Sequence, residues 1–127
     1  MRKLTFAAIC AVGLTFAAGT VFAAGIFAAA ASAGSQPSAL VAHVQGGQAI
    51  PGGAGPFFIY FAANNTNAAA CATSKNVFSI DPTTDQGRVA ISVVMAAYIG
   101  GKTVWATGAG TCNLYNGVED LSNVYIN

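Results

Sequence analysis

The sequence predicts an α+β or mostly β fold: a small barrel with one helix, preceded by an export leader. The strand prediction depends on short apolar runs that are separated by Gly, Pro and Asn turns. The helix prediction depends on one longer segment that has capping signals at both ends. The length of 127 residues allows one small domain at most, and a composition that is 54% hydrophobic argues against disorder.

Residues 1–33 have the composition of a secretory signal peptide. Arg2 and Lys3 form a positive start, and the uncharged stretch 4–31 follows them. This stretch is rich in Ala and Gly and poor in bulky apolar side chains, which favours a cleaved signal over a membrane anchor. An uncleaved anchor remains the alternative, because a stretch of this length can span a bilayer.

Two small-residue sites compete for cleavage. Cleavage after Ala23 leaves an apolar region of ordinary length, whereas cleavage after Ala33 falls where Gly34 and Pro37 make the composition loop-like. We favour the second site. Residues 34–127 then form a single exported domain, secreted or periplasmic.

The strands are expected on both sides of the helix. The strongest signal is Phe57–Phe61, a run of aromatic and β-branched residues. Lys102–Thr107 alternates between two faces, with Trp105 on the face opposite Val104. Residues 48–55 contain a proline and several glycines and are expected to form a loop. The expected strands are 40–44, 57–61, 71–80, 102–107 and 121–126.

One helix is expected over about 84–99. Thr83 and Gln86 match a capping box, Asp85 suits the positive end of a helix dipole, and the glycines at 100–101 supply a stop. The apolar residues of this segment cover more than one face. We therefore expect the helix to be buried on several sides, against a sheet and a neighbouring subunit.

The cysteines predict a single disulfide. Removal of the leader with Cys10 leaves Cys71 and Cys112, and an even pair in an exported domain is typical of a disulfide bond. Closing this long loop would stabilise the fold by roughly 4 kcal/mol in the chain-entropy model. A metal site would need more ligands than one His and two distant Cys, so we expect neither a metal nor another cofactor.

Charge is sparse and unevenly distributed. The Lys and Arg residues do not cluster, which excludes a nucleic-acid-binding surface. Segment 34–74 contains no charged residue, and only His43 within it titrates near neutrality. Two explanations remain open: a sheet shielded by the helix, or a subunit interface, whose centre is typically depleted of charge.

Catalytic motifs are absent from the sequence. His43 is the only histidine, and no G-x-S-x-G, H-E-x-x-H or phosphate-binding G-x-x-x-x-G-K-[ST] pattern occurs. The acidic residues are explained by the start of the helix and by a turn before the last strand. We expect His43 to be a half-buried strand residue, and the protein not to be an enzyme.

Three aromatic residues are the candidates for ligand binding: Trp105, Tyr115 and Tyr125. Trp105 shares its strand face with Thr103 and Thr107, and aromatic faces beside hydroxyls and amides suit the C–H faces and hydroxyls of sugar rings. The alternative is that Trp105 packs across the interior of a closed barrel or against a neighbouring subunit.

Two stretches resemble the B subunits of pentameric toxins, such as the binding subunit of subtilase cytotoxin. They are Ala70–Lys75 (ACATSK) and Tyr98–Val104 (YIGGKTV), and the order of strands, cysteines and helix is similar as well. The resemblance covers about Ala70–Cys112. It implies an OB-fold, a ring-shaped homo-oligomer and binding of cell-surface glycans or glycoproteins. No sugar-contacting residue of the family can be matched to a position here.

The leading hypothesis is an exported, non-catalytic, glycan-binding module of a bacterium. The alternative is a structural or interaction protein of the bacterial envelope that assembles with itself through the charge-free segment 34–74.

Overall fold

The computed structural model describes residues 32–47 and 49–127. The expected leader, with Cys10 and the alternative cleavage site after Ala23, lies outside the described residues, except for Ser32 and Ala33 at its end. No helix in the described part of the chain is long and apolar enough to cross a membrane.

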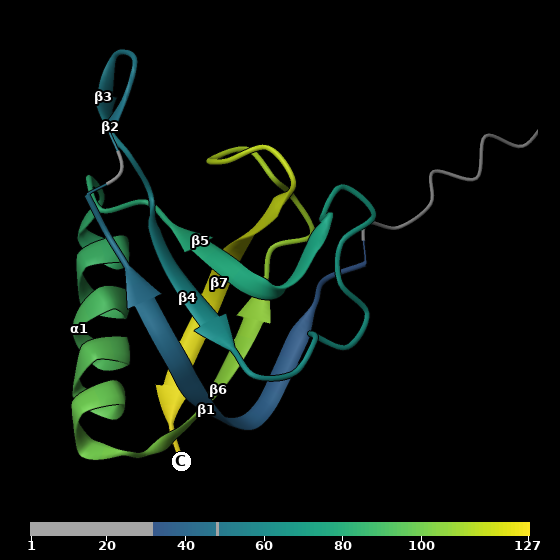
Figure 1. Cartoon of the computed structure of the whole chain (residues 1–127), viewed down its shortest axis with the longest axis vertical. Coiled ribbons are helices and arrows are strands. Elements are labelled where there is room, and N and C mark those ends of the chain that lie inside the picture. The colour runs from purple at the N-terminus through teal and green to yellow at the C-terminus, as the bar shows by residue number, and fades with distance from the viewer. Residues whose placement is uncertain (1–31, 48) are drawn as a thin grey trace, which may run out of the picture.

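Within the described residues, five strands close into a barrel in the order β1-β4-β5-β7-β6, and β6 pairs back to β1 (Figure 1). All pairs are antiparallel except β5 with β7. The barrel strands are β1 (Ser35–Gln45), β4 (Phe57–Phe61), β5 (Ser74–Ile80), β6 (Thr103–Gly108) and β7 (Val118–Ile126). A small barrel with one helix and one disulfide was predicted, and the structure confirms it.

Two further elements lie outside the barrel wall. Helix α1 (Asp85–Gly100) connects β5 to β6 and packs along one side of the barrel, mainly against β7 and β1 (Figure 1). A hairpin of β2 (Ala49–Ile50) and β3 (Gly53–Ala54) projects from the connection between β1 and β4. This hairpin lies within residues 48–55, which were predicted to form a loop.

Alternation along the strands builds the core. In β6, Val104 and Ala106 are buried inside the barrel, while Trp105 faces outward between them. Phe61 of β4 meets Phe78 of β5 edge to face inside the barrel, with ring centroids 6.2 Å apart. The buried Val94 and Ala97 of α1 belong to the same core cluster.

The largest difference between a predicted and an observed strand boundary lies in β1. β1 starts at Ser35 rather than at residue 40, and its first half pairs with β6 while its second half pairs with β4. The pairing with β6 shifts register between Gln36 and Ala39, where Ser38 has a φ of 49°. Three other starts also differ: β5 begins at residue 74 rather than 71, β6 at 103 rather than 102, and β7 at 118 rather than 121.

The helix is placed within one residue of the prediction, but its N-cap is different. Thr84 caps α1, and its hydroxyl oxygen accepts a hydrogen bond of 3.0 Å from the N–H of Gly87. The predicted capping box of Thr83 and Gln86 is wrong, because the Thr83 hydroxyl instead donates to Asp81. At the other end, Gly101 takes the left-handed conformation that terminates the helix, as predicted.

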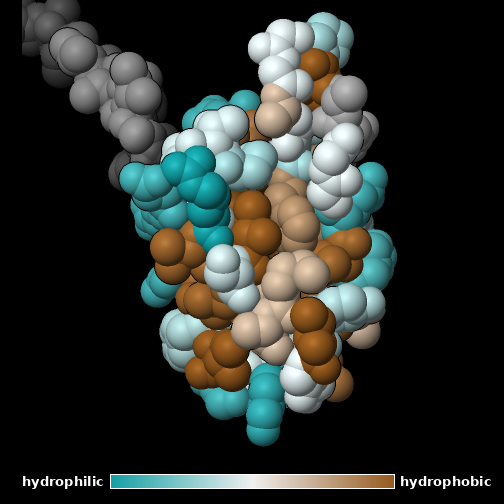
Figure 2. All heavy atoms as spheres, turned by 90° about the vertical axis from the view of Figure 1, so that its left-hand side faces the viewer, coloured by the Kyte–Doolittle hydropathy of each residue, from teal (hydrophilic) through white to brown (hydrophobic). Residues whose placement is uncertain are grey.

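One side of α1 is not covered by this chain. Gly87, Val94 and Ala97 are its buried residues, whereas Val89 and Ile99 are exposed, the latter by 79%. Figure 2 faces this side and shows apolar side chains along it. Within the single chain the helix is buried on the side that faces the barrel, and its predicted contact with a neighbouring subunit stays a prediction.

The predicted disulfide is present. Cys71 and Cys112 are bonded, with their Cα atoms 6.1 Å apart. The bond joins the loop before β5 to the loop between β6 and β7. Cys71 itself lies in a turn, since β5 starts at Ser74.

Candidate functional site

An aromatic pair lies on the outer face of the barrel. Trp105 of β6 and Tyr125 of β7 are direct cross-strand partners. Their ring centroids are 6.0 Å apart and their planes are inclined by 8°. Trp105 is half-buried and Tyr125 is 45% exposed, so both rings keep part of their surface in contact with solvent.

Neutral polar side chains surround this pair. Thr103 and Thr107 share the outer face of β6 with the indole, and Asn123 of β7 is paired with Thr107. Beside them, the Asn127 side-chain amide donates a hydrogen bond of 2.8 Å to the hydroxyl of Ser38. Hydroxyls and amides therefore border the rings, and none of these side chains carries a formal charge.

The outward position of Trp105 excludes the alternative that this side chain packs across the interior of the barrel. Val104 and Ala106 occupy the barrel interior at this level, so Trp105 does not pack across the inside of the barrel. Tyr125 is placed on the same outer surface because Val124 before it is buried. The alternation of β6 had placed Trp105 on the face opposite Val104, but it left open which face is the outside of the barrel and did not predict that the two rings meet.

Tyr115 lies apart from this pair. Its ring meets Phe58 edge to face at 5.2 Å, and it packs against a small cluster of Phe58, Val77 and Val118. The structure thus brings together two of the three aromatic residues that the sequence singled out. Tyr115 instead covers the outside of β4 and β5.

A second aromatic contact was not anticipated. His43 of β1 stacks on Tyr60 of β4, with ring centroids 4.0 Å apart and an angle of 13°. The Tyr60 hydroxyl donates to Oε1 of Gln45 at 3.2 Å. His43 was expected to be half-buried and is exposed. The alternation of each strand indicates the outer face, but the register that opposes the two rings was not readable from the sequence.

The carboxylates at the start of β7 are structural. Asp120 accepts four hydrogen bonds: from the hydroxyls of Ser79 (3.1 Å) and Thr111 (2.7 Å) and from the N–H groups of Asn113 (2.8 Å) and Leu114 (3.1 Å). Glu119 beside it is fully buried. The sequence analysis placed both residues in a turn, which is wrong, since they are strand residues that anchor the preceding loop.

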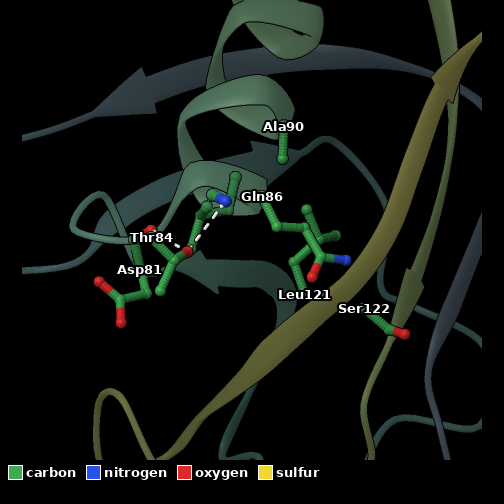
Figure 3. A pocket seen from close by; sticks show the side chains of 8 residues that line it. Asp81, Thr84, Gln86, Ala90, Leu121 and Ser122 are labelled. Atoms are coloured by element: carbon green, nitrogen blue, oxygen red, sulfur yellow. Dashed lines mark hydrogen bonds between the residues drawn. The ribbon is translucent and has the colours of Figure 1, made fainter.

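A pocket of about 250 Å³ lies between the start of α1 and β7 (Figure 3). Asp81 is the only charged residue among the described residues that line it, and its side chain points away from Gln86 and Leu121. The Thr83 hydroxyl and backbone N–H donate hydrogen bonds to this carboxylate, which lowers its pKa below the ordinary value of 3.8. Asp81 and Thr84 thus take part in the hydrogen bonds at the start of the helix.

The described residues hold no arrangement for metal binding: they contain no group of three or more His, Cys, Asp or Glu side chains that could hold an ion. Comparison of the chain with models of known families, with curated proteins and with solved structures finds no match.

Proposed function

We propose that the protein is an exported, non-catalytic carbohydrate-binding module of a bacterium, and that Trp105 and Tyr125 bind the face of a sugar ring. The single observation that carries this proposal is the paired rings on the outside of the barrel, bordered by hydroxyls and amides. Sugar rings offer C–H faces that pack on aromatic rings and hydroxyls that exchange hydrogen bonds with such a rim.

The architecture supports this proposal in a second way. The order β1-β4-β5-β7-β6, with α1 between the third and fourth barrel strands of the chain, is compatible with an OB-like barrel. OB-folds bind oligosaccharides and oligonucleotides, and the sparse basic residues disfavour the second class. The resemblance to pentameric toxin B subunits points to cell-surface glycans or glycoproteins as the ligands, and to a ring-shaped homo-oligomer.

Export is supported by the disulfide. Disulfides persist in oxidising compartments, and the bond between Cys71 and Cys112 fits a protein that is secreted or periplasmic.

A glycan array probed with the oxidised domain 34–127 tests the binding proposal. We expect selective binding to a small set of glycans, which Trp105→Ala abolishes. The control is His43→Ala, which removes an exposed ring from the other aromatic contact and should leave binding intact. Loss of binding in His43→Ala with retention in Trp105→Ala would refute the assignment to Trp105.

A second candidate is an envelope protein that assembles with itself through segment 34–74. The observation that favours it is Leu40, which is 56% exposed in β1 and pairs with Thr103 next to Trp105. Native mass spectrometry of the wild type and of Leu40→Gln distinguishes the two candidates. An oligomer that dissociates on Leu40→Gln, together with an empty array, would favour assembly.

A further inference from the structure

Among the residues that the structure describes, no cationic side chain pairs with the fully buried carboxylate of Glu119. Its side chain is 0% exposed and lies at the start of β7. Three backbone N–H groups donate to it: those of Gly34 (2.8 Å), Ala69 (3.0 Å) and Gly110 (3.1 Å). In the part of the chain that the structure describes, the only ion pair lies at the exposed start of α1. A buried charge is costly unless an opposite charge compensates it.

The chain enters the fold at this carboxylate. Ser32 and Ala33 are exposed, whereas Gly34 is buried. A Cβ at position 34 would lie 2.6 Å from Oε2 of Glu119 and 3.2 Å from Cα of Ala68, so glycine permits this close approach. The backbone nitrogen of Gly34 is thereby held against the carboxylate.

The side chain of Asn65, which is polar and unpaired among the described residues, lies next to Gly34. Asn65 is 6% exposed, and among the described residues neither its Oδ1 nor its Nδ2 has a hydrogen-bond partner. Its Cβ lies 3.4 Å from the position that a Cβ of Gly34 would take. Leaving a buried amide unpaired is unfavourable, so its oxygen lacks a donor here and its nitrogen lacks an acceptor.

We propose that a signal peptidase hydrolyses the Ala33–Gly34 bond and that the α-ammonium group of Gly34 is the cationic partner of Glu119. Hydrolysis adds one water: its hydroxyl goes to the carbonyl carbon of Ala33 and a hydrogen goes to the nitrogen of Gly34. The new carboxylic acid then gives its proton to the amine, which yields a carboxylate on the leader and an ammonium on the domain. Cleavage precedes folding, because folding buries Gly34.

The α-ammonium group of Gly34 offers more hydrogen-bond donors and more charge than the backbone amide that it replaces. An amide nitrogen carries one hydrogen, whereas the ammonium carries three and a full positive charge. One hydrogen keeps the bond to Glu119, and another is available for the amide oxygen of Asn65. Cleavage after Ala23 would leave an amide at position 34. The inference shares with the proposed function only the export of the chain, so an empty glycan array would not affect it.

The first experiment uses the wild-type chain. The full-length protein is exported from a bacterial host and its intact mass is measured, which we expect to match residues 34–127 with one disulfide. The purified protein is then acetylated with a limiting amine-reactive ester at neutral pH. In an unfolded chain the α-amine, with a pKa of about 7.7–8.0, reacts faster than lysine, with a pKa of about 10.4.

Folding should reverse the order in which the α-amine and the lysines are acetylated. Lys75 and Lys102 are exposed and serve as internal references, while the amine of Gly34 lies against Glu119. We expect Gly34 to be acetylated more slowly than both lysines in the folded protein, and faster than both after reduction and denaturation. A mass that begins at residue 24, or an α-amine that reacts faster than the lysines in the folded state, would overturn the proposal.

A double-mutant cycle measures the pairing itself. Domains that start at Gly34 or three residues earlier are compared, each with and without Glu119→Gln. We expect Glu119→Gln to lower the Tm by about 4–8 °C more in the form that starts at Gly34. Asp120→Asn is the control, since Asp120 is buried in the same strand but bonds to other groups, and its effect should be equal in both forms. Equal losses from Glu119→Gln in the two forms would overturn the pairing, and if that variant does not fold, the labelling experiment still decides.

Discussion

Trp105 and Tyr125 oppose each other across β6 and β7, with their ring planes within 8° of parallel. Because the residues before them, Val104 and Val124, are buried, the alternation of both strands directs the two rings outward. The same alternation keeps the barrel interior aliphatic at this level. The rings are thus supported by the core without being part of it, which is the property that a rigid binding platform needs.

The disulfide should contribute strongly to stability. Replacing Cys71 and Cys112 together by Ser removes a bond across 41 positions of the chain, and we expect the free energy of unfolding to fall by roughly 4 kcal/mol. Urea denaturation of the oxidised wild type and of the double variant measures this difference. A reducing agent should lower the midpoint of the wild type and leave that of the double variant unchanged.

Asp120 of β7 should be needed to hold the loop between β6 and β7. Asp120→Ala leaves the N–H groups of Asn113 and Leu114 without their acceptor and removes one of the two acceptors of the buried Ser79 hydroxyl. We expect a loss of about 2–4 kcal/mol in the free energy of unfolding. Ser122→Ala, at an exposed position of the same strand, is the control and should change stability by less than about 0.5 kcal/mol. A small effect of Asp120→Ala would show that the loop is held by other contacts.

The N-cap of α1 can be assigned by substitution. Thr84→Ala removes the acceptor for the N–H of Gly87 and should cost about 1 kcal/mol of stability. Thr83→Ala keeps that acceptor and removes only an exposed hydrogen bond to Asp81, so its cost should be smaller. Thermal unfolding of both variants measures the order, and a larger loss from Thr83→Ala would contradict the cap seen in the structure.

Asp81 should make stability depend on acidic pH. Hydrogen bonds from the Thr83 hydroxyl and backbone N–H stabilise the ionised carboxylate and lower its pKa. A group with a lowered pKa in the folded state stabilises the fold above its unfolded pKa of about 3.9, and the contribution is lost as the pH falls through the lowered value. The urea midpoint should therefore decline less between about pH 5 and pH 2 in Asp81→Asn than in the wild type. Parallel declines would exclude a role of this group.

Local patterns predicted β4, β6 and the end of α1. The alternation of β6, the run of β4 and the glycine stop of α1 are each determined within a few residues of sequence. The long β1 was underestimated because Pro37 and Ser38 resemble a loop, while the structure uses them as a bulge that lets one strand pair with both β6 and β4.

The sequence did not predict the register between strands or which polar side chains are buried. The stacking of His43 on Tyr60 depends on which positions of β1 and β4 oppose each other, and alternation does not determine this. Glu119 is buried because backbone N–H groups from three distant segments converge on it. Such convergence depends on the closed barrel, so the sequence analysis explained Glu119 only by a turn before the last strand.

The central claim is that the outer aromatic pair binds carbohydrate, and Trp105 is the only tryptophan in the chain. Its fluorescence therefore reports on the site without a label. The most direct measurement is a fluorescence titration of the domain 34–127 with a glycan that it retains on an array. We predict a saturable change in Trp105 emission, with an affinity at least about tenfold weaker in Tyr125→Ala. Binding detected by calorimetry with unchanged emission, or no binding to any glycan, would contradict the account.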